Sequence, residues 1–301
     1  MRENASVKPQ LIATLVAGLS VGMASAQSSV VFSVSASNGN GSASWSVSAQ
    51  DLGGLVPTDL SSPVDWTLEA PVELRDDETG ELIAILDGAN AGLDPELNAS
   101  NNTSGGASVT LGADPAINLS FAVIAGAADT TFNISSAEIM INPALINVMG
   151  SATAAISLTD ANGDGVATMT GLVEGSTVGP AGRDIAGAAV PPASMYGAFF
   201  DDDTSGDNLI TPFAFLIDSP VTTATTTSIE ESFPATPPQM TNIPTEPIEA
   251  ISTQFSFTLS AGDLASGTSR FTLNGELVPA PSGAAAILLA CGVIGHGRRR
   301  R

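Results

Sequence analysis

The feature that most constrains the fold is a period-two alternation of apolar and small polar residues. Between residues 27 and 50 it places Phe32 and Val34 on one face of an extended chain and Val31 and Ser33 on the other. Such alternation predicts β-strands that bury one face. Between the two ends of the chain we find no run with the i, i+3, i+4, i+7 spacing of an amphipathic helix, so we expect an all-β body.

Turn residues divide the alternating segments into separate strands. Asn38-Gly39-Asn40-Gly41 predicts a hairpin turn, because Asn and Gly tolerate positive φ. Pro71 interrupts the alternating segment 64–74 and predicts an edge strand or a split one. The polar segment 75–80 predicts a turn that returns the chain into a strand over 81–86.

Short apolar runs rich in β-branched residues follow at spacings of about a dozen residues. We expect strands over 107–111, 117–124, 130–141, 146–158, 208–217, 254–259 and 270–277, with Asn274-Gly275 as a candidate turn in the last one. This rhythm is typical of two-layer all-β folds. The sequence therefore predicts an antiparallel β-sandwich or jelly-roll-like body over residues 27–277.

The segment from Phe233 to Glu249 holds five prolines. Proline fixes φ and lacks an N–H, so this composition predicts a connector without regular structure. Two interpretations remain open, a boundary between two units and a long crossover loop within one.

The body is strongly acidic. The chain has a formal net charge of −22, and all of its 31 Asp and Glu residues except Glu3 lie in the body. The only basic residues between 27 and 297 are Arg75, Arg183 and Arg270. Such a surface repels phosphate backbones, so we predict that the protein binds no nucleic acid.

The residues missing from the body exclude several kinds of catalysis. The single cysteine is Cys291 and the single histidine is His296, both near the C-terminus. Zinc ligation, a histidine-activated serine and a serine–lysine pair therefore have no candidates in the body. A pair of carboxylates of the glycosidase kind is formally open, but few aromatic residues are available to line a sugar cleft. We predict that the protein is not an enzyme and needs no cofactor.

One motif resembles part of a calcium loop. Asp160, Asn162 and Asp164 alternate with small residues and precede Gly165, as the oxygen ligands do at the start of an EF-hand loop. Position twelve is Gly171 and not Glu, and the flanking segments predict strands. The motif predicts a β-hairpin turn, either alone or with a bound Ca²⁺.

A second acidic group contains Asp201, Asp202, Asp203 and Asp207. Alternate carboxylates could share a cation, but blocks of like charge usually form solvated loops. We interpret this group as a solvated loop.

The start of the chain predicts a secretory signal peptide. Arg2 and Lys8 precede an apolar core over residues 11–22. Ala24 and Ala26 then form a small-x-small cleavage site, so the mature chain should begin near Gln27. We assign residues 1–26 to a signal-peptide helix removed by signal peptidase.

The end of the chain predicts a short membrane segment. It begins with Val278-Pro279-Ala280-Pro281, continues with an uncharged apolar run over 284–295, and ends with Arg298-Arg299-Arg300-Arg301. An apolar helix followed by arginines stops in a membrane with the cations on the cytoplasmic side. The run is short for a stable span, which needs about 20 residues.

This tail, residues 278–301, resembles the PEP-CTERM sorting signal of exported bacterial proteins. Pro279 and Pro281 match the two prolines of that motif, and Ala280 stands where the family has Glu. The resemblance implies recognition by an exosortase-type enzyme and release at the cell surface. An ordinary anchor that is never cleaved is the alternative.

Together these features predict an exported protein of the outer surface or extracellular matrix, transiently anchored in the inner membrane. Its expected role is structural or interactive, with surface polysaccharide as one expected partner. The alternative is a Ca²⁺-assisted module that binds carbohydrate or another ligand.

Overall fold

The computed structural model describes residues 30–48, 50–52, 64–94, 112–173, 178–186, 193–201, 209–236, 238–244 and 247–278. Within these residues nearly every segment is a β-strand, and no α-helix occurs. Helical geometry in this part of the chain is confined to the 3-10 helix η1, Pro180–Gly182. The prediction of an all-β body is confirmed.

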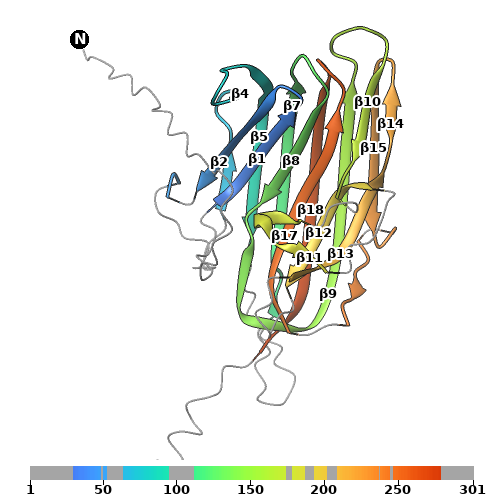
Figure 1. Cartoon of the computed structure of the whole chain (residues 1–301). Coiled ribbons are helices and arrows are strands. Elements are labelled where there is room, and N and C mark those ends of the chain that lie inside the picture. Colours follow the sequence, from blue (N-terminus) through green and yellow to red (C-terminus); the bar gives the residue numbers. More distant parts are fainter. Residues whose placement is uncertain are drawn as a thin grey trace, which may run out of the picture.

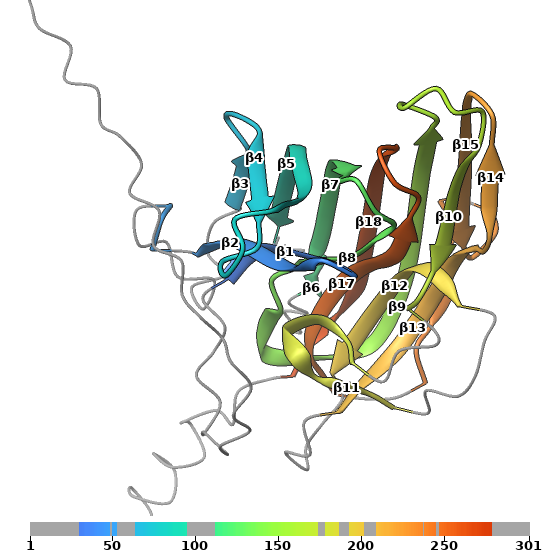
Figure 2. The same ribbon diagram turned by 45° about the horizontal axis from the view of Figure 1, so that its top comes forward.

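The strands form an antiparallel sheet that curls so that two halves face each other (Figures 1 and 2). We name the halves after their central strands. The β17 half contains, in order, β2 (Gly41–Ser48), β1 (Val30–Asn38), β8 (Thr130–Ser136) and β17 (Ile248–Leu259), followed by β12 (Ser194–Asp201) with β13 (Leu209–Asp218) and by β10 (Ala167–Gly171) with β14 (Val221–Thr223).

The β18 half begins with two short edge strands that both pair with β5. Its strands are β3 (Val64–Thr67), β4 (Val72–Arg75), β5 (Leu82–Asp94), β7 (Ala116–Ala125), β18 (Leu264–Leu277), β9 (Ile139–Thr159) and β15 (Thr226–Phe233). Two short strands extend its edges, β6 (Gly112–Ala113) against β18 and β16 (Thr241–Asn242) against β9. One parallel pair joins β11 (Asp184–Ile185) to β13.

The strand β9 belongs to both halves. Its first residues, up to Leu145, pair with β17, and its residues from Leu145 onward pair with β18. A register shift marks the crossing, where Asn147 has a φ of 53°. Strands that change sheets through a bulge form the corners of two-layer β folds.

Aromatic side chains fill the space between the halves. Phe121 of β7 lies against Phe255 of β17, with ring centroids 4.9 Å apart. Phe213 of β13 stacks on Phe271 of β18 at 5.1 Å. These contacts join strands far apart in sequence, so the core holds the curl closed.

Several local predictions are confirmed. β1 and β2 form a hairpin through residues 39 and 40. Pro71 separates β3 from β4, and both are edge strands paired with β5. The strand predicted over 208–217 corresponds to β13.

Three local predictions are wrong. Val31 is fully buried, because a register shift between Val30 and Phe32 turns it inward. Asn274-Gly275 forms no turn, because β18 continues through it and is paired on both sides. The strands expected over 130–141 and 146–158 have the wrong boundary, because β8 ends at Ser136 and β9 is continuous from Ile139 to Thr159.

The proline-rich segment after Phe233 carries the chain from β15 in one half to β17 in the other. β16 lies within it and pairs with β9, and the side chain of Ile243 is buried. Ile243 within the segment and Ile248 at its end therefore belong to the same hydrophobic core.

Candidate binding face and its surroundings

The outer side of the β18 half carries small polar side chains. Along β7 and β18, positions that face outward alternate with fully or nearly fully buried ones. On β18 the outward positions include Ser266 and Thr268, and on β7 they include Ser120 and Ala122. The period-two pattern thus gives these strands an apolar inner face and an outer face rich in hydroxyl groups.

Strand register aligns these side chains into rows that cross the strands. In one row Ala155, Thr268, Ser120, Asn90 and Thr67 lie opposite one another on five successive strands. A second row contains Ser157, Ser266, Ala122 and Gly88. Directly opposed side chains in a sheet are near neighbours, so each row is a continuous track across the half.

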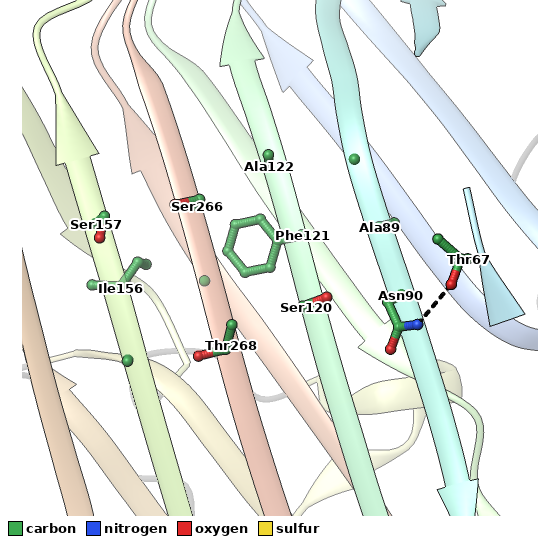
Figure 3. Close-up of a pocket in the computed structure, with 13 residues that line it drawn as sticks. Thr67, Ala89, Asn90, Ser120, Phe121, Ala122, Ile156, Ser157, Ser266 and Thr268 are labelled. Atoms are coloured by element: carbon green, nitrogen blue, oxygen red, sulfur yellow. Dashed lines mark hydrogen bonds between the residues drawn. The ribbon is translucent and has the colours of Figure 1, made fainter. Parts of the chain in front are cut away.

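A shallow groove of about 360 Å³ follows these rows (Figure 3). We call its lining the open face. It consists of Thr67, Gly88, Ala89, Asn90, Ser120, Phe121, Ala122, Ala155, Ile156, Ser157, Ser266, Gly267 and Thr268. None of these residues is charged, although the chain has a net charge of −22. Loops and edge strands carry most of the described carboxylates instead.

The floor of the groove depends on a glycine. Gly267 lies opposite Phe121 in the pairing of β18 with β7, and the Phe121 ring lies between these strands (Figure 3). A Cβ atom at Gly267 would stand 2.5 Å from Cε1 of Phe121. The missing side chain therefore gives the Phe121 ring its place on the core side of the two strands, beneath the groove.

Hydrogen bonds fix polar groups at both ends of the rows. Nδ2 of Asn90 donates to Oγ1 of Thr67 at 2.9 Å. At the other end, the hydroxyls of Ser157 and Ser228 are 2.6 Å apart. Charged side chains stand at the rim, where Glu230 is opposite Ala155 and Arg270 follows Thr268 by two residues.

The outer side of the β17 half is closed over β12. All eight residues of β12 are buried, so this strand is covered on both faces. On its outer face Phe199 packs in a second apolar cluster with Val173, Ile185 and Ile210. The segment 178–186, which contains η1 and β11, supplies part of this covered face.

The side chain of Arg183 attaches the segment 178–186 to the sheet. Nη1 of Arg183 donates to Oε1 of Glu138 and, at 2.7 Å, to Oδ2 of Asp201. Nη2 donates to the carbonyl oxygen of Leu209 at 2.7 Å. The three charged side chains are only 12–17% exposed. Burial alone would lower the pKa of Arg183, but the hydrogen bonds and negative charges of the two carboxylates outweigh it and raise that pKa.

The motif at Asp160 is a loop that carries the chain from β9 to β10. Oδ1 and Oδ2 of Asp160 accept hydrogen bonds from the N–H groups of Gly163 and Gly165, at 2.8 and 2.9 Å. Both glycines have positive φ, which the turn requires. Asn162 accepts from the N–H of Asp164 and donates to the carbonyl of Ala261.

The expected hairpin at this motif is wrong, because β9 and β10 do not pair. At Thr159 both edges of β9 are already occupied, by Leu264 of β18 and by Thr226 of β15. The loop therefore passes to the other half, where β10 pairs with β14 and β17. In the part of the chain that the structure describes, no three His, Cys, Asp or Glu side chains are arranged to hold a metal ion.

The other residues singled out in the sequence are only partly placed. Asp201 ends β12 and binds Arg183, whereas Asp202, Asp203 and Asp207 lie outside the described residues. The N–H of Val278 donates to the carbonyl of Ala144 at 2.9 Å.

The two sorting signals also fall mostly outside the described residues. These are Ala24, Ala26 and Gln27 of the cleavage site, and Pro279, Ala280, Pro281 and the four terminal arginines of the tail. Among the residues that are described, no helix is long and apolar enough to span a membrane.

Sequence reasoning missed the open face and the role of Arg183. The outward Ser and Thr positions were visible as alternation, but nothing local says which strands stand side by side. Compared with known protein families and with curated proteins, the chain shows no match.

Proposed function

We propose that this chain is an exported protein of the cell surface or extracellular matrix that acts by contact and not by catalysis. The observation that carries the proposal is the open face: a groove across five strands, lined only by uncharged residues, on an otherwise acidic body. Such a face offers hydrogen-bonding groups but no charged acid, base or nucleophile.

The two ends of the sequence support export and localisation at the cell surface. A signal peptide over residues 1–26 would direct export through signal peptidase, and the tail over 278–301 would hold the protein in the inner membrane for an exosortase-type enzyme. β18 ends at Leu277, directly before the tail, so the body would sit close to the membrane until release.

In architecture we group the body with antiparallel β-sandwiches of the jelly-roll-like kind. Support comes from the two facing halves around one core and from β9, which belongs to both. Such a body needs no disulfide, because its core is large enough to stabilise it.

Intact mass of the protein recovered outside the cell tests the proposal. We expect a chain that begins near Gln27 and lacks Arg298 to Arg301. A chain found in the cytosol with Met1 and the final arginines attached would overturn the proposal. An exported chain that keeps the arginines would remove only the exosortase step.

A further inference from the structure

We propose that the open face binds an extended, uncharged polysaccharide that lies across the strands. This inference rests on the proposed surface role and adds the chemical class of the partner.

The charge distribution selects an uncharged partner. The groove contains no carboxylate to hold a cation and no Lys or Arg to hold an anion. A net charge of −22 on the whole chain repels anionic polymers from the surrounding surface. A neutral polymer meets neither barrier, so the face favours it over nucleic acids and acidic polysaccharides.

The chemistry of the lining suits hydroxyl groups. Ser120, Thr268 and Ser266 each present a hydroxyl that can both donate and accept a hydrogen bond. The amide of Asn90 has one N–H held by Thr67, which orients its oxygen and remaining N–H. Sugar hydroxyls also donate and accept, so they can satisfy these groups without a fixed direction.

The rows give the site an elongated shape. The row from Ala155 through Thr268 and Ser120 to Thr67 crosses five strands, a distance of about 19 Å at the usual spacing of neighbouring strands. Two small residues, Gly88 and Ala122, lie in the adjoining row. A linear polymer laid along the rows meets a polar side chain on most of the strands it crosses.

A protein partner fits this face poorly. The cores of protein interfaces are enriched in aromatic residues, Met and Arg and depleted in Ser and Ala. The open face has the opposite composition, and its one ring, Phe121, is 4% exposed. A sugar chain on this face therefore has no exposed ring to stack on, unlike in an aromatic sugar cleft, and is held by hydrogen bonds alone. Binding therefore depends on many weak hydrogen bonds along a repeating polymer, and short oligosaccharides should bind far more weakly than long chains.

Affinity electrophoresis of the protein recovered from the cell exterior tests the inference. The gels contain dextran, laminarin, hydroxyethyl cellulose or, as an anionic comparison, alginate. We expect at least one neutral polymer to retard the protein. Thr268→Asp and Ser120→Asp should each weaken this retardation at least about tenfold, because a carboxylate is desolvated against a neutral chain.

Ser44→Asp is the matched control, since Ser44 is exposed on β2 in the other half. It adds the same charge but should leave the retardation unchanged. Circular dichroism checks that each variant keeps its β-structure.

Four results would overturn the inference. They are retardation by no neutral polymer, retardation by alginate alone, equal retardation of all variants, and a change of oligomeric state in Thr268→Asp and Ser120→Asp that reveals a second copy of the chain on this face. None of them affects the mass measurement, so the proposed export and processing would stand or fall separately.

Discussion

The open face and the covered face show how one sheet uses its outer side in two ways. Over β12, apolar residues such as Phe199 point outward, and the segment 178–186 packs on them. Over the middle of β7 and β18, the outward residues that line the groove are Ser120, Ala122, Ser266 and Thr268. Apolar side chains at outward positions gain from being covered, whereas small polar ones can stay in contact with water.

The two faces also differ in how they treat charge. The covered face holds the ion pairs of Arg183 with Glu138 and Asp201, which are shielded from water. The open face keeps charges at its rim, at Glu230 and Arg270. On the covered face, buried ion pairs attach one segment to another. On the open face, the lack of charged side chains leaves a surface that suits a neutral partner.

The largest loss of stability should come from removing the Phe199 ring from the covered face. Phe199→Ala should lower the free energy of unfolding by about 3–4 kcal/mol, since it removes a fully buried ring and leaves a cavity. Urea denaturation measures it. Phe233→Ala is the control, because Phe233 is 41% exposed and should cost less than about 1 kcal/mol. Equal losses would show that segment 178–186 adds no packing.

Removing the ion pairs of Arg183 should lower the free energy of unfolding slightly less. Arg183→Met should lower the free energy of unfolding by about 3 kcal/mol, because it leaves Glu138 and Asp201 with a buried, uncompensated charge. Arg75→Met removes an exposed pair with Glu73 and should cost less than about 1 kcal/mol. If both variants melt alike, the charges of the covered face do not hold the segment.

On the open face, Gly267→Ala should lower the free energy of unfolding by about 1–3 kcal/mol, because the new Cβ meets the Phe121 ring and overpacks the core. Gly88→Ala is the matched control in the same groove, where the nearest atom would be at 3.9 Å. Chemical denaturation compares them. A neutral Gly267→Ala would mean that the ring can move aside.

The loop between the halves should contribute about 1 kcal/mol. Asp160→Ala removes the acceptor for two backbone N–H groups, whereas Asp77→Ala, in an exposed turn, should be nearly neutral. Thermal melts with calcium and with a chelator test the alternative. A Tm that rises with calcium in the native chain but not in Asp160→Ala would support a bound ion.

The smallest effect should appear on acidification. Hydrogen bonds from the N–H groups of Ser42 and Thr79 lower the pKa of the Asp76 carboxyl below its ordinary value. Its contribution to stability is therefore complete above that value and is lost as the pH falls through the lower pKa of the folded state. The native chain should lose more stability between pH 6 and pH 3 than Asp76→Asn. Equal losses in urea titrations would contradict the assignment.

Much of the fold could be predicted locally. Pro71 lies in the break between β3 and β4, and Asn38-Gly39-Asn40-Gly41 turns β1 into β2, because φ preferences act within a few residues. The same signal failed at Asn274-Gly275, where pairing with β9 and β6 on both sides kept β18 extended. Long-range pairing overrides a local turn preference when both edges of a strand are occupied.

Residue order alone shows that this chain builds strands with one apolar face and that its body carries a large negative charge without cysteine or histidine. Those properties follow from residue type and period. The pairing and packing of distant strands place Thr268 beside Ser120, give Phe121 its room at Gly267, and bring Arg183 to Glu138 and Asp201. A period of two shows that a strand has one apolar and one polar face. The register between strands far apart in sequence then determines which side chains lie against each of these faces.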